Sequence, residues 1–360
     1  MENVFKKNHM KTLQTILFLA IILLNINLSY SQKIKELTYE PLDNEFIDLK
    51  RTLAEIGRTD DQRSIDLCLI GLDKFKDMSV RNNLIYWNLS FHYASLEQYD
   101  KCFEILKQGQ KEGLFYYTRS GSRAFPPYLV ELEKFEGYEA FIEQNTALRE
   151  EASKTTETEY MIQLPDDYNE NTKYPLIIIM HGGIGDIRSM QYNYISKKLN
   201  SDFIVAYFQG SNISGSFSRR FAREDWQGEI KQGYKQIISK YPVDTSNIIL
   251  AGPSAGAYRS LVLGLNNEIP AMGLLLSFTV NPRVWDSTLY IKSAERGLKV
   301  ALLCGENDWA IQQQKKLGYW LDKYGITNRF VVFPETGHGF PENWPYYLDT
   351  SLEFILMEDL

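Results

Sequence analysis

The chain has 360 residues, which is long enough to bury a sizeable core and to hold two domains. Its 44% hydrophobic and 24% charged residues are ordinary for a globular protein. The net charge is −7 and no long basic tract follows residue 31, so nucleic acid is excluded as an expected partner.

The N-terminus has the pattern of a secretory signal peptide. Three lysines within the first 11 residues precede an unbroken apolar run at 16–24, which is too short to span a bilayer comfortably. Ser29 and Ser31 then stand at the small-residue positions of a cleavage site. We therefore predict a signal peptide over residues 1–31 and an exported protein, periplasmic or extracellular. An uncleaved membrane anchor is the alternative; after cleavage we expect no stable membrane span.

Residues 32–150 are predicted to form a helical domain, because apolar residues recur there at helical spacing and glycines are few. The stretch 85–113 resembles one tetratricopeptide helix pair. Its first helix would carry Tyr86, Leu89, Tyr93 and Leu96, and its second Tyr99, Cys102 and Leu106. Cys102 follows Cys68 by 34 residues, the period of that repeat. The earlier copy is degraded and no clear third copy follows, so we expect this domain to pack against what comes next. A protein partner bound through it stays open.

The three cysteines do not suggest a disulfide framework. Cys68, Cys102 and Cys304 are few and odd in number, and each lies in an apolar periodic stretch. We expect buried free thiols.

Beyond a polar linker at 150–159, strand-like and helix-like segments alternate. The expected strands are 160–165, 174–183, 202–210, 247–252, 271–278, 298–305 and 329–337. Helical stretches lie between most of them, at 225–240, 255–266 and 310–324. This order predicts an α/β domain over 151–360, with a mostly parallel sheet covered by helices on both faces. In such sheets ligands bind at the carboxyl ends of the strands.

Three side chains suited to acyl transfer fall at those strand ends. Ser254 follows the strand 247–252 and stands between two glycines in "GPSAG". A serine hydroxyl is a weak nucleophile unless a base takes its proton and a third group orients that base. His338, between two glycines, follows the last strand, and Asp308 in "GENDW" follows the strand before it.

These pieces resemble the α/β-hydrolase family, over roughly residues 160–355. The resemblance rests on the Ser…Asp…His order, the G-x-S-x-G turn, the upstream "HGG" and the stretch "YMIQLPDDYNENTKYPLIIIMHGG". It implies Ser254 as nucleophile, His338 as base and Asp308 as its orienting acid, with the backbone N–H groups of Gly183 and Ala255 as an oxyanion hole. It implies no cofactor. Pro253 before the nucleophile departs from the family's usual residue.

Two assignments within this site have rivals. Glu306 shares its loop with Asp308, although the position of Asp308 in "GEND" matches the family's acid. His181 is interpreted as a structural residue that orients the oxyanion loop, with a second base as the alternative. The four histidines are scattered and no HExxH or CxxC spacing occurs, so we expect no metal site.

The sequence thus predicts an exported serine hydrolase of carboxylic esters that acts through an acyl-enzyme. A serine peptidase of the same fold and a non-catalytic helical-repeat binding protein with a hydrolase-like domain are the alternatives. We expect a small-molecule or polysaccharide-linked ester as substrate. Five aromatic residues could line a substrate cleft or belong to the core: Trp226, Tyr258, Trp285, Trp309 and Phe340. Arg219 and Arg220 could bind an acidic group of the substrate or lie in a solvated loop.

Overall fold

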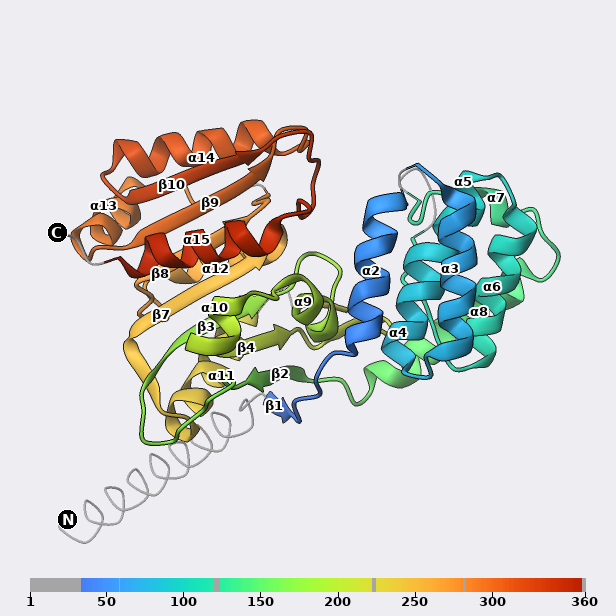
Figure 1. Cartoon of the computed structure of the whole chain (residues 1–360), viewed down its shortest axis with the longest axis horizontal. Coiled ribbons are helices and arrows are strands. Elements are labelled where there is room, and N and C mark those ends of the chain that lie inside the picture. Colours follow the sequence, from blue (N-terminus) through green and yellow to red (C-terminus); the bar gives the residue numbers. More distant parts are fainter. Residues whose placement is uncertain (1–33, 58, 120–123, 222–224, 281–282, 358–360) are drawn as a thin grey trace, which may run out of the picture. The chain divides into compact units, whose positions relative to one another are not determined.

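The computed structural model describes residues 34–57, 59–119, 124–221, 225–280 and 283–357 (Figure 1). The predicted signal peptide lies outside these residues. From Lys35 onward the described chain forms one compact unit. Within the described ranges, no helix has both the length and the apolar character needed to cross a membrane.

The described chain is mainly helical from Asn44 to Ser153. The elements of this stretch are α2 (Asn44–Ile56), α3 (Asp61–Lys74), α4 (Met78–Asn82), the π-helical η1 (Asn83–Leu89), α5 (Ser90–Ser95), α6 (Tyr99–Lys111), α7 (Leu129–Leu132) and α8 (Tyr138–Ser153). The carboxylates of Asp43, Asp60 and Asp77 accept backbone N–H groups of the first turns of α2, α3 and α4. These N-caps fix where the three helices begin, because they satisfy N–H groups that have no partner inside the helix.

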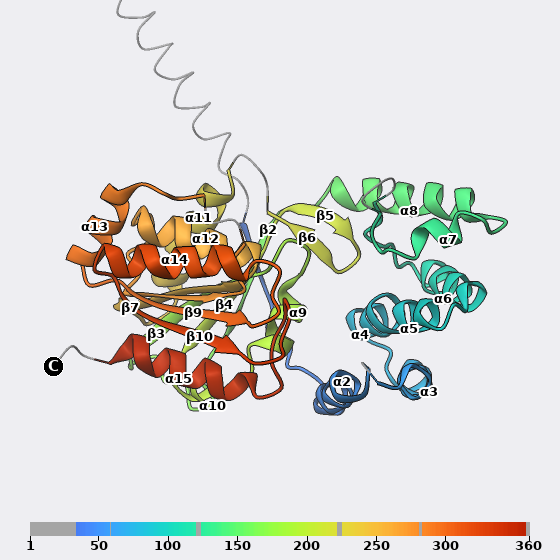
Figure 2. The same ribbon diagram turned by 90° about the horizontal axis from the view of Figure 1, so that it is seen from above.

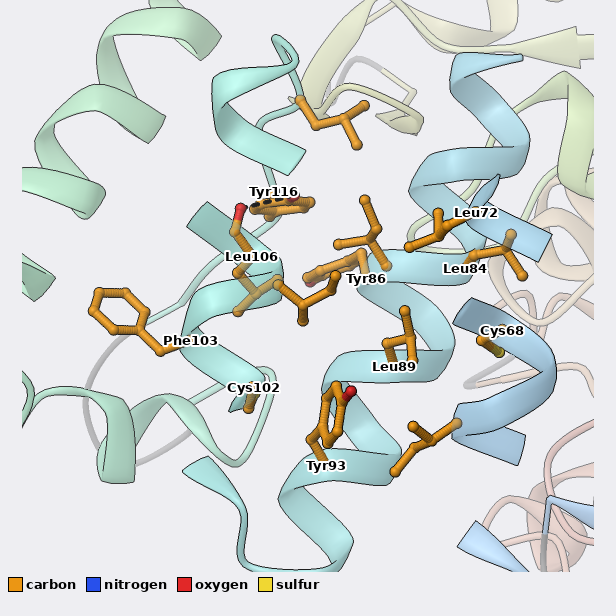
Figure 3. Packing of buried hydrophobic residues seen from close by; sticks show 14 of the residues in the cluster. Cys68, Leu72, Leu84, Tyr86, Leu89, Tyr93, Cys102, Phe103, Leu106 and Tyr116 are labelled. Carbon is orange, nitrogen blue, oxygen red and sulfur yellow. Dashed lines mark hydrogen bonds between the residues drawn. The ribbon is translucent and has the colours of Figure 1, made fainter. Parts of the chain in front are cut away.

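The helices pack through one apolar core (Figure 3). Tyr86 and Tyr116 stack within it, with ring centroids 5.1 Å apart, and the Tyr86 hydroxyl donates to the carbonyl of Tyr117. Cys68 and Cys102 lie in this core and Cys304 in the sheet; all three are buried and unpaired, as predicted.

The expected helix pair differs from the observed one in two respects. Its first helix is π-helical over Asn83–Leu89 and α-helical only from Ser90. It ends at Ser95, so Leu96, expected on the helix, follows it and is 37% exposed. The tetratricopeptide interpretation and the predicted domain boundaries stay predictions. Helix α8 runs on to Ser153, three residues past the predicted boundary.

Eight of the described strands form one sheet in the order β1-β2-β4-β3-β7-β8-β9-β10. They are β1 (Ile34–Leu37), β2 (Thr158–Gln163), β3 (Tyr174–Met180), β4 (Ile204–Gln209), β7 (Val243–Pro253), β8 (Gly273–Ser277), β9 (Lys299–Gly305) and β10 (Thr327–Phe333). Strand β2 pairs antiparallel with β4, whereas every pair from β4 to β10 is parallel. The predicted α/β fold with a mostly parallel sheet is confirmed. Strand β1 was not expected.

Helices cover both faces of this sheet. They are α9 (Ile187–Asn193), α10 (Lys197–Asp202), α11 (Trp226–Lys240), α12 (Ala255–Leu265), α13 (Ser287–Glu295), α14 (Ile311–Lys323) and α15 (Trp344–Leu356). Figure 2 shows α11, α12 and α14 on one face and α10 and α15 on the other. The central strands β3, β4, β8 and β9 are buried on both faces over most of their length, so they read as continuous apolar runs. The chain runs from β3 to β4 and then crosses to β7 on the other side of β3, so β3 and β7 meet at the point where the winding reverses.

The helical part packs on the rest of the chain, as expected. Phe115 and Ser216 are joined by two hydrogen bonds, from Ser216 N to Phe115 O at 2.7 Å and from Phe115 N to Ser216 Oγ at 2.8 Å. Ser216 connects the two strands of a hairpin, β5 (Asn212–Gly215) and β6 (Ser218–Arg220). Arg220 of this hairpin donates to the hydroxyl of Tyr117 at 2.5 Å.

Candidate active site

Ser254 lies on a strained turn between β7 and α12. Its φ of 55° and ψ of −116° are rare for a residue with a side chain. The turn is held by its neighbours, because Ser254 N donates to Ser277 O at 2.7 Å and Tyr258 N donates to Ser254 O at 3.1 Å. Strain of this kind persists only where the surroundings over-determine it, and it concentrates at functional sites.

The two flanking glycines have a specific steric reason. A Cβ added to Gly252 would lie 2.2 Å from the carbonyl oxygen of Met180, and one added to Gly256 would lie 2.0 Å from the same oxygen. Met180 is the last residue of β3, so the missing Cβ atoms let the end of β3 lie directly against the turn. Gly252 also has a φ of 158°, at the limit of what other residues adopt.

His338 reaches Ser254 from the loop after β10. Its Nε2 lies 3.1 Å from Ser254 Oγ, and its Nδ1 lies 3.0 Å from each carboxylate oxygen of Asp308. The carboxylate accepts the Nδ1 hydrogen, so Nε2 is free to accept the hydrogen of the serine hydroxyl. The imidazole is 24% exposed, which leaves it reachable from solvent.

Asp308 is fixed more firmly than the sequence suggested. Its side chain is fully buried, and beyond His338 it accepts the backbone N–H of Ala310 at 2.8 Å and the side-chain amide of Gln314 at 2.9 Å. The rival Glu306 is exposed and accepts the backbone N–H of Glu335 at 3.0 Å. The structure therefore brings Asp308, and not Glu306, to the histidine.

Gln314 was missed by the sequence analysis. It lies in the first turn of α14, fully buried, six residues after the aspartate. Its only sequence signal is a polar side chain on a helix face that otherwise turns inward, at Leu317 and Leu321.

His181 has both ring nitrogens engaged. Nε2 accepts the backbone N–H of Gly210 at 3.2 Å, so Nδ1 carries the hydrogen and donates to Gly182 O at 2.8 Å. The ring is buried and stacks on Phe221 at 4.6 Å. Burial, aided by the positive charge of Arg259, lowers the pKa of His181 to about 3. A neutral ring with both nitrogens used fits the structural interpretation rather than a second base.

The "HGG" turn lies over the serine. A Cβ added to Gly182 would lie 3.7 Å from Ser254 Cβ, whereas one added to Gly183 would meet open space. Ala255 is the first residue of α12, where the helix dipole favours negative charge. Both predicted oxyanion donors thus belong to segments that adjoin the serine.

The aromatic residues of open role lie in three places. The Trp309 ring lies against that of His338 in a tilted arrangement, with centroids 5.0 Å apart. Phe340 packs at 5.1 Å on Phe278, which itself lies 5.9 Å from His338. Trp285 instead packs with Trp320.

The remaining two aromatic residues lie on or beside α12. Tyr258 is four residues beyond the serine on this helix, and Trp226 lies beside the guanidinium of Arg259 at 5.7 Å.

Neither arginine of the β6 strand belongs to a solvated loop, so that interpretation was wrong. Arg219 pairs with Glu159 at 3.3 Å, and Arg220 packs over the ring of Tyr117 at 4.7 Å while donating to its hydroxyl. Both guanidinium groups therefore serve the packing of the hairpin.

No group of three or more His, Cys, Asp or Glu side chains within the described ranges is arranged to hold a metal ion. The side chains gathered at the strand ends are those of nucleophilic catalysis: a hydroxyl, an imidazole and a buried carboxylate.

No protein-family model matches the chain, and no curated protein matches it. Among solved structures, an uncharacterized protein from Bacillus cereus is 20% identical with a TM-score of 0.49, covering 88% of this chain and 99% of that one. A ferulic acid esterase is 15% identical with a TM-score of 0.45, covering 54% and 90%. An S-formylglutathione hydrolase from Staphylococcus aureus is 15% identical with a TM-score of 0.42, covering 54% and 88%. These likenesses are distant.

Proposed function

We propose that the protein is a serine hydrolase of carboxylic esters. The observation that carries the proposal is the hydrogen-bonded series from the buried Asp308 through His338 to Ser254, on a strained turn at the carboxyl end of β7. A buried carboxylate, an imidazole and a hydroxyl at these distances are the arrangement that activates a serine.

In this proposal Ser254 Oγ attacks the ester carbonyl while His338 Nε2 takes its proton. The carbonyl oxygen becomes an oxyanion that the N–H groups of Gly183 and Ala255 stabilise, each by about 3–4 kcal/mol. The C–O bond to the alcohol then breaks, and His338 returns the proton to the leaving oxygen. Water, activated by the same imidazole, releases the acid and restores the serine. Asp308 holds the ring throughout, and no cofactor takes part.

A serine peptidase would use the same groups, so the side chains alone do not separate esters from amides. Both reactions pass through an acyl-enzyme that water releases, so the partial exposure of the imidazole serves either one. Parallel assays on an acetyl ester and the matching acetyl amide separate the two.

A fluorophosphonate probe tests the proposal directly, because it labels only an activated serine. The native chain should be labelled and should hydrolyse phenyl acetate, and Ser254→Ala should abolish both. Ser246→Ala, at the exposed start of β7, is the matched control and should change neither. Equal labelling of the Ser254→Ala variant would reject the assignment.

The proposal includes export, with cleavage after residue 31. N-terminal mass analysis of the protein secreted by an expressing cell tests this separately from catalysis. A mature chain that starts at Gln32 supports export. A full-length chain retained in the membrane fraction supports the anchor instead.

A further inference from the structure

Trp309 is a large aromatic side chain held in solvent beside the proposed base. It is 66% exposed, although its neighbours Asp308 and Ala310 are buried. The backbone around it forms the turn into α14, in which Ala310 N donates to the Asp308 carboxylate at 2.8 Å and Ile311 N donates to Asp308 O at 3.0 Å. These two bonds fix the backbone on both sides of Trp309.

The indole is also aligned with the imidazole. The ring centroids of Trp309 and His338 lie 5.0 Å apart with their planes inclined by 33°. The other ring that contacts His338, that of Phe278, is inclined by 58° and is buried. Trp309 is therefore an open aromatic surface that adjoins the base.

The chemistry of the base determines which part of a substrate meets this surface. In the proposed function, His338 returns its proton to the leaving oxygen, so that oxygen must come within hydrogen-bonding distance of Nε2. The group bonded to this oxygen is then held beside the imidazole, within reach of the indole. The acyl group is bonded to Ser254 Oγ instead.

We infer that Trp309 is the binding site for the alcohol portion of the ester, and that this portion carries a ring with a flat apolar face. Such a face belongs to an aryl group and also to the C–H face of a sugar, and both stack on indole. This inference rests on the proposed function, which it deepens by assigning the class of leaving group.

The inference separates two kinetic steps. Acetyl esters of different alcohols pass through the same acetyl-enzyme, so their deacylation rates are identical. The constant kcat/KM covers the steps from substrate binding to departure of the alcohol. Loss of an alcohol-binding surface should therefore lower kcat/KM and leave the deacylation rate unchanged. The decrease in kcat/KM should be larger for esters whose alcohol carries a ring than for esters whose alcohol carries none.

The experiment compares phenyl acetate, an acetylated methyl glucoside and methyl acetate on the full chain. Trp309→Ala should lower kcat/KM for at least one ring ester at least tenfold more than for methyl acetate. Trp309→Phe, which keeps a flat ring, should recover most of that loss. A loss confined to phenyl acetate assigns an aryl alcohol, and one confined to the glucoside assigns a sugar. Tyr319→Ala is the matched control, since this tyrosine is 62% exposed on α14 and should leave all three values unchanged.

An equal loss on all three esters would overturn the inference, because Trp309 would then act through the position of His338. Absence of any loss would overturn it as well. Binding of phenyl acetate and of the glucoside acetate to full-length Ser254→Ala protein, measured by fluorescence with and without Trp309→Ala, keeps this test independent of turnover. Binding that weakens about tenfold on Trp309→Ala, together with no fluorophosphonate labelling of the chain that keeps Ser254, would support the ring site and reject the proposed function. Labelling and turnover that do not depend on Trp309 would support the proposed function and reject the ring site.

Discussion

Both carboxylate oxygens of Asp308 lie 3.0 Å from Nδ1 of His338, and the Asp308 side chain is fully buried. A carboxylate so placed can only accept, so it fixes one tautomer of the ring. The orientation of the imidazole toward Ser254 follows from this pair.

Asp308→Asn should therefore lower kcat on phenyl acetate by about four orders of magnitude, because an amide can donate to Nδ1 and so favour the wrong tautomer. Glu306→Gln is the control from the same loop. Its carboxylate is exposed and bonds only a backbone N–H, so kcat should stay within about threefold of the native value. A larger loss in Glu306→Gln than in Asp308→Asn would show that the acid is misassigned.

Gln314 should matter for activity more than for stability. Gln314→Met removes the 2.9 Å bond to Asp308, but it also removes the Oε1 atom, which is buried without a hydrogen-bond partner. These two effects oppose each other, so the free energy of unfolding should change by no more than about 1 kcal/mol. With one support lost, Asp308 holds the ring less firmly, and kcat should fall about tenfold.

Denaturant unfolding and steady-state kinetics on the same preparation measure the two effects. Gln312→Met, at an exposed position of α14, is the matched control for the change of side chain. A loss of stability of several kcal/mol in Gln314→Met with kcat unchanged would show that this glutamine serves packing alone.

Burial of His181 makes stability depend on pH. Its folded-state pKa of about 3 lies below the usual 6.5, so between these values the unfolded chain binds a proton that the native chain does not. This contribution is absent above pH 6.5 and destabilises the protein progressively as the pH falls toward 3. At pH 5 it amounts to about 2 kcal/mol relative to pH 8.

Nitrogen-15 spectra of the histidine rings test the premise. The His181 signals should keep the pattern of a neutral ring, with the hydrogen on Nδ1, from pH 8 to pH 5. A titration midpoint near 6.5 for this ring would contradict the burial argument, whatever the unfolding curves show.

Much of this site could be predicted from the sequence because its chemistry is tied to strand ends. Ser254, Asp308 and His338 each follow an apolar run that the structure shows as a strand, and parallel strands bring such positions to one edge. The chain order then favoured these three residues over other polar residues of the loops.

What could not be predicted depends on contacts distant in sequence. The guanidinium of Arg220 donates a hydrogen bond to Tyr117, which lies more than a hundred residues earlier, and no local sequence pattern predicts that contact. The exposure of Trp309 depends on the turn that buries Asp308, whereas tryptophan side chains are on average largely buried. The π-helical turn over Asn83–Leu89 likewise keeps the apolar spacing of an ordinary helix.

The contact between Gly256 and the end of β3 gives the strictest steric prediction. Gly256→Ala places a Cβ 2.0 Å from Met180 O and 2.8 Å from His181 O, and both partners are backbone atoms that no rotamer change can move. Either β3 or the turn must shift, so we expect a loss of about 3 kcal/mol or more in the free energy of unfolding. Activity should fall below detection, because the shift displaces Ser254 from His338.

Gly318→Ala is the control. Gly318 lies inside α14, and its added Cβ would lie 3.5 Å from the Phe330 side chain, an ordinary van der Waals distance. There the helix propensity of alanine should raise stability by about 0.5–1 kcal/mol and leave activity intact. Thermal unfolding and fluorophosphonate labelling of both variants give the comparison. A Gly256→Ala protein that is as stable as the native chain and labels at the native rate would show that β3 does not lie against the turn as described.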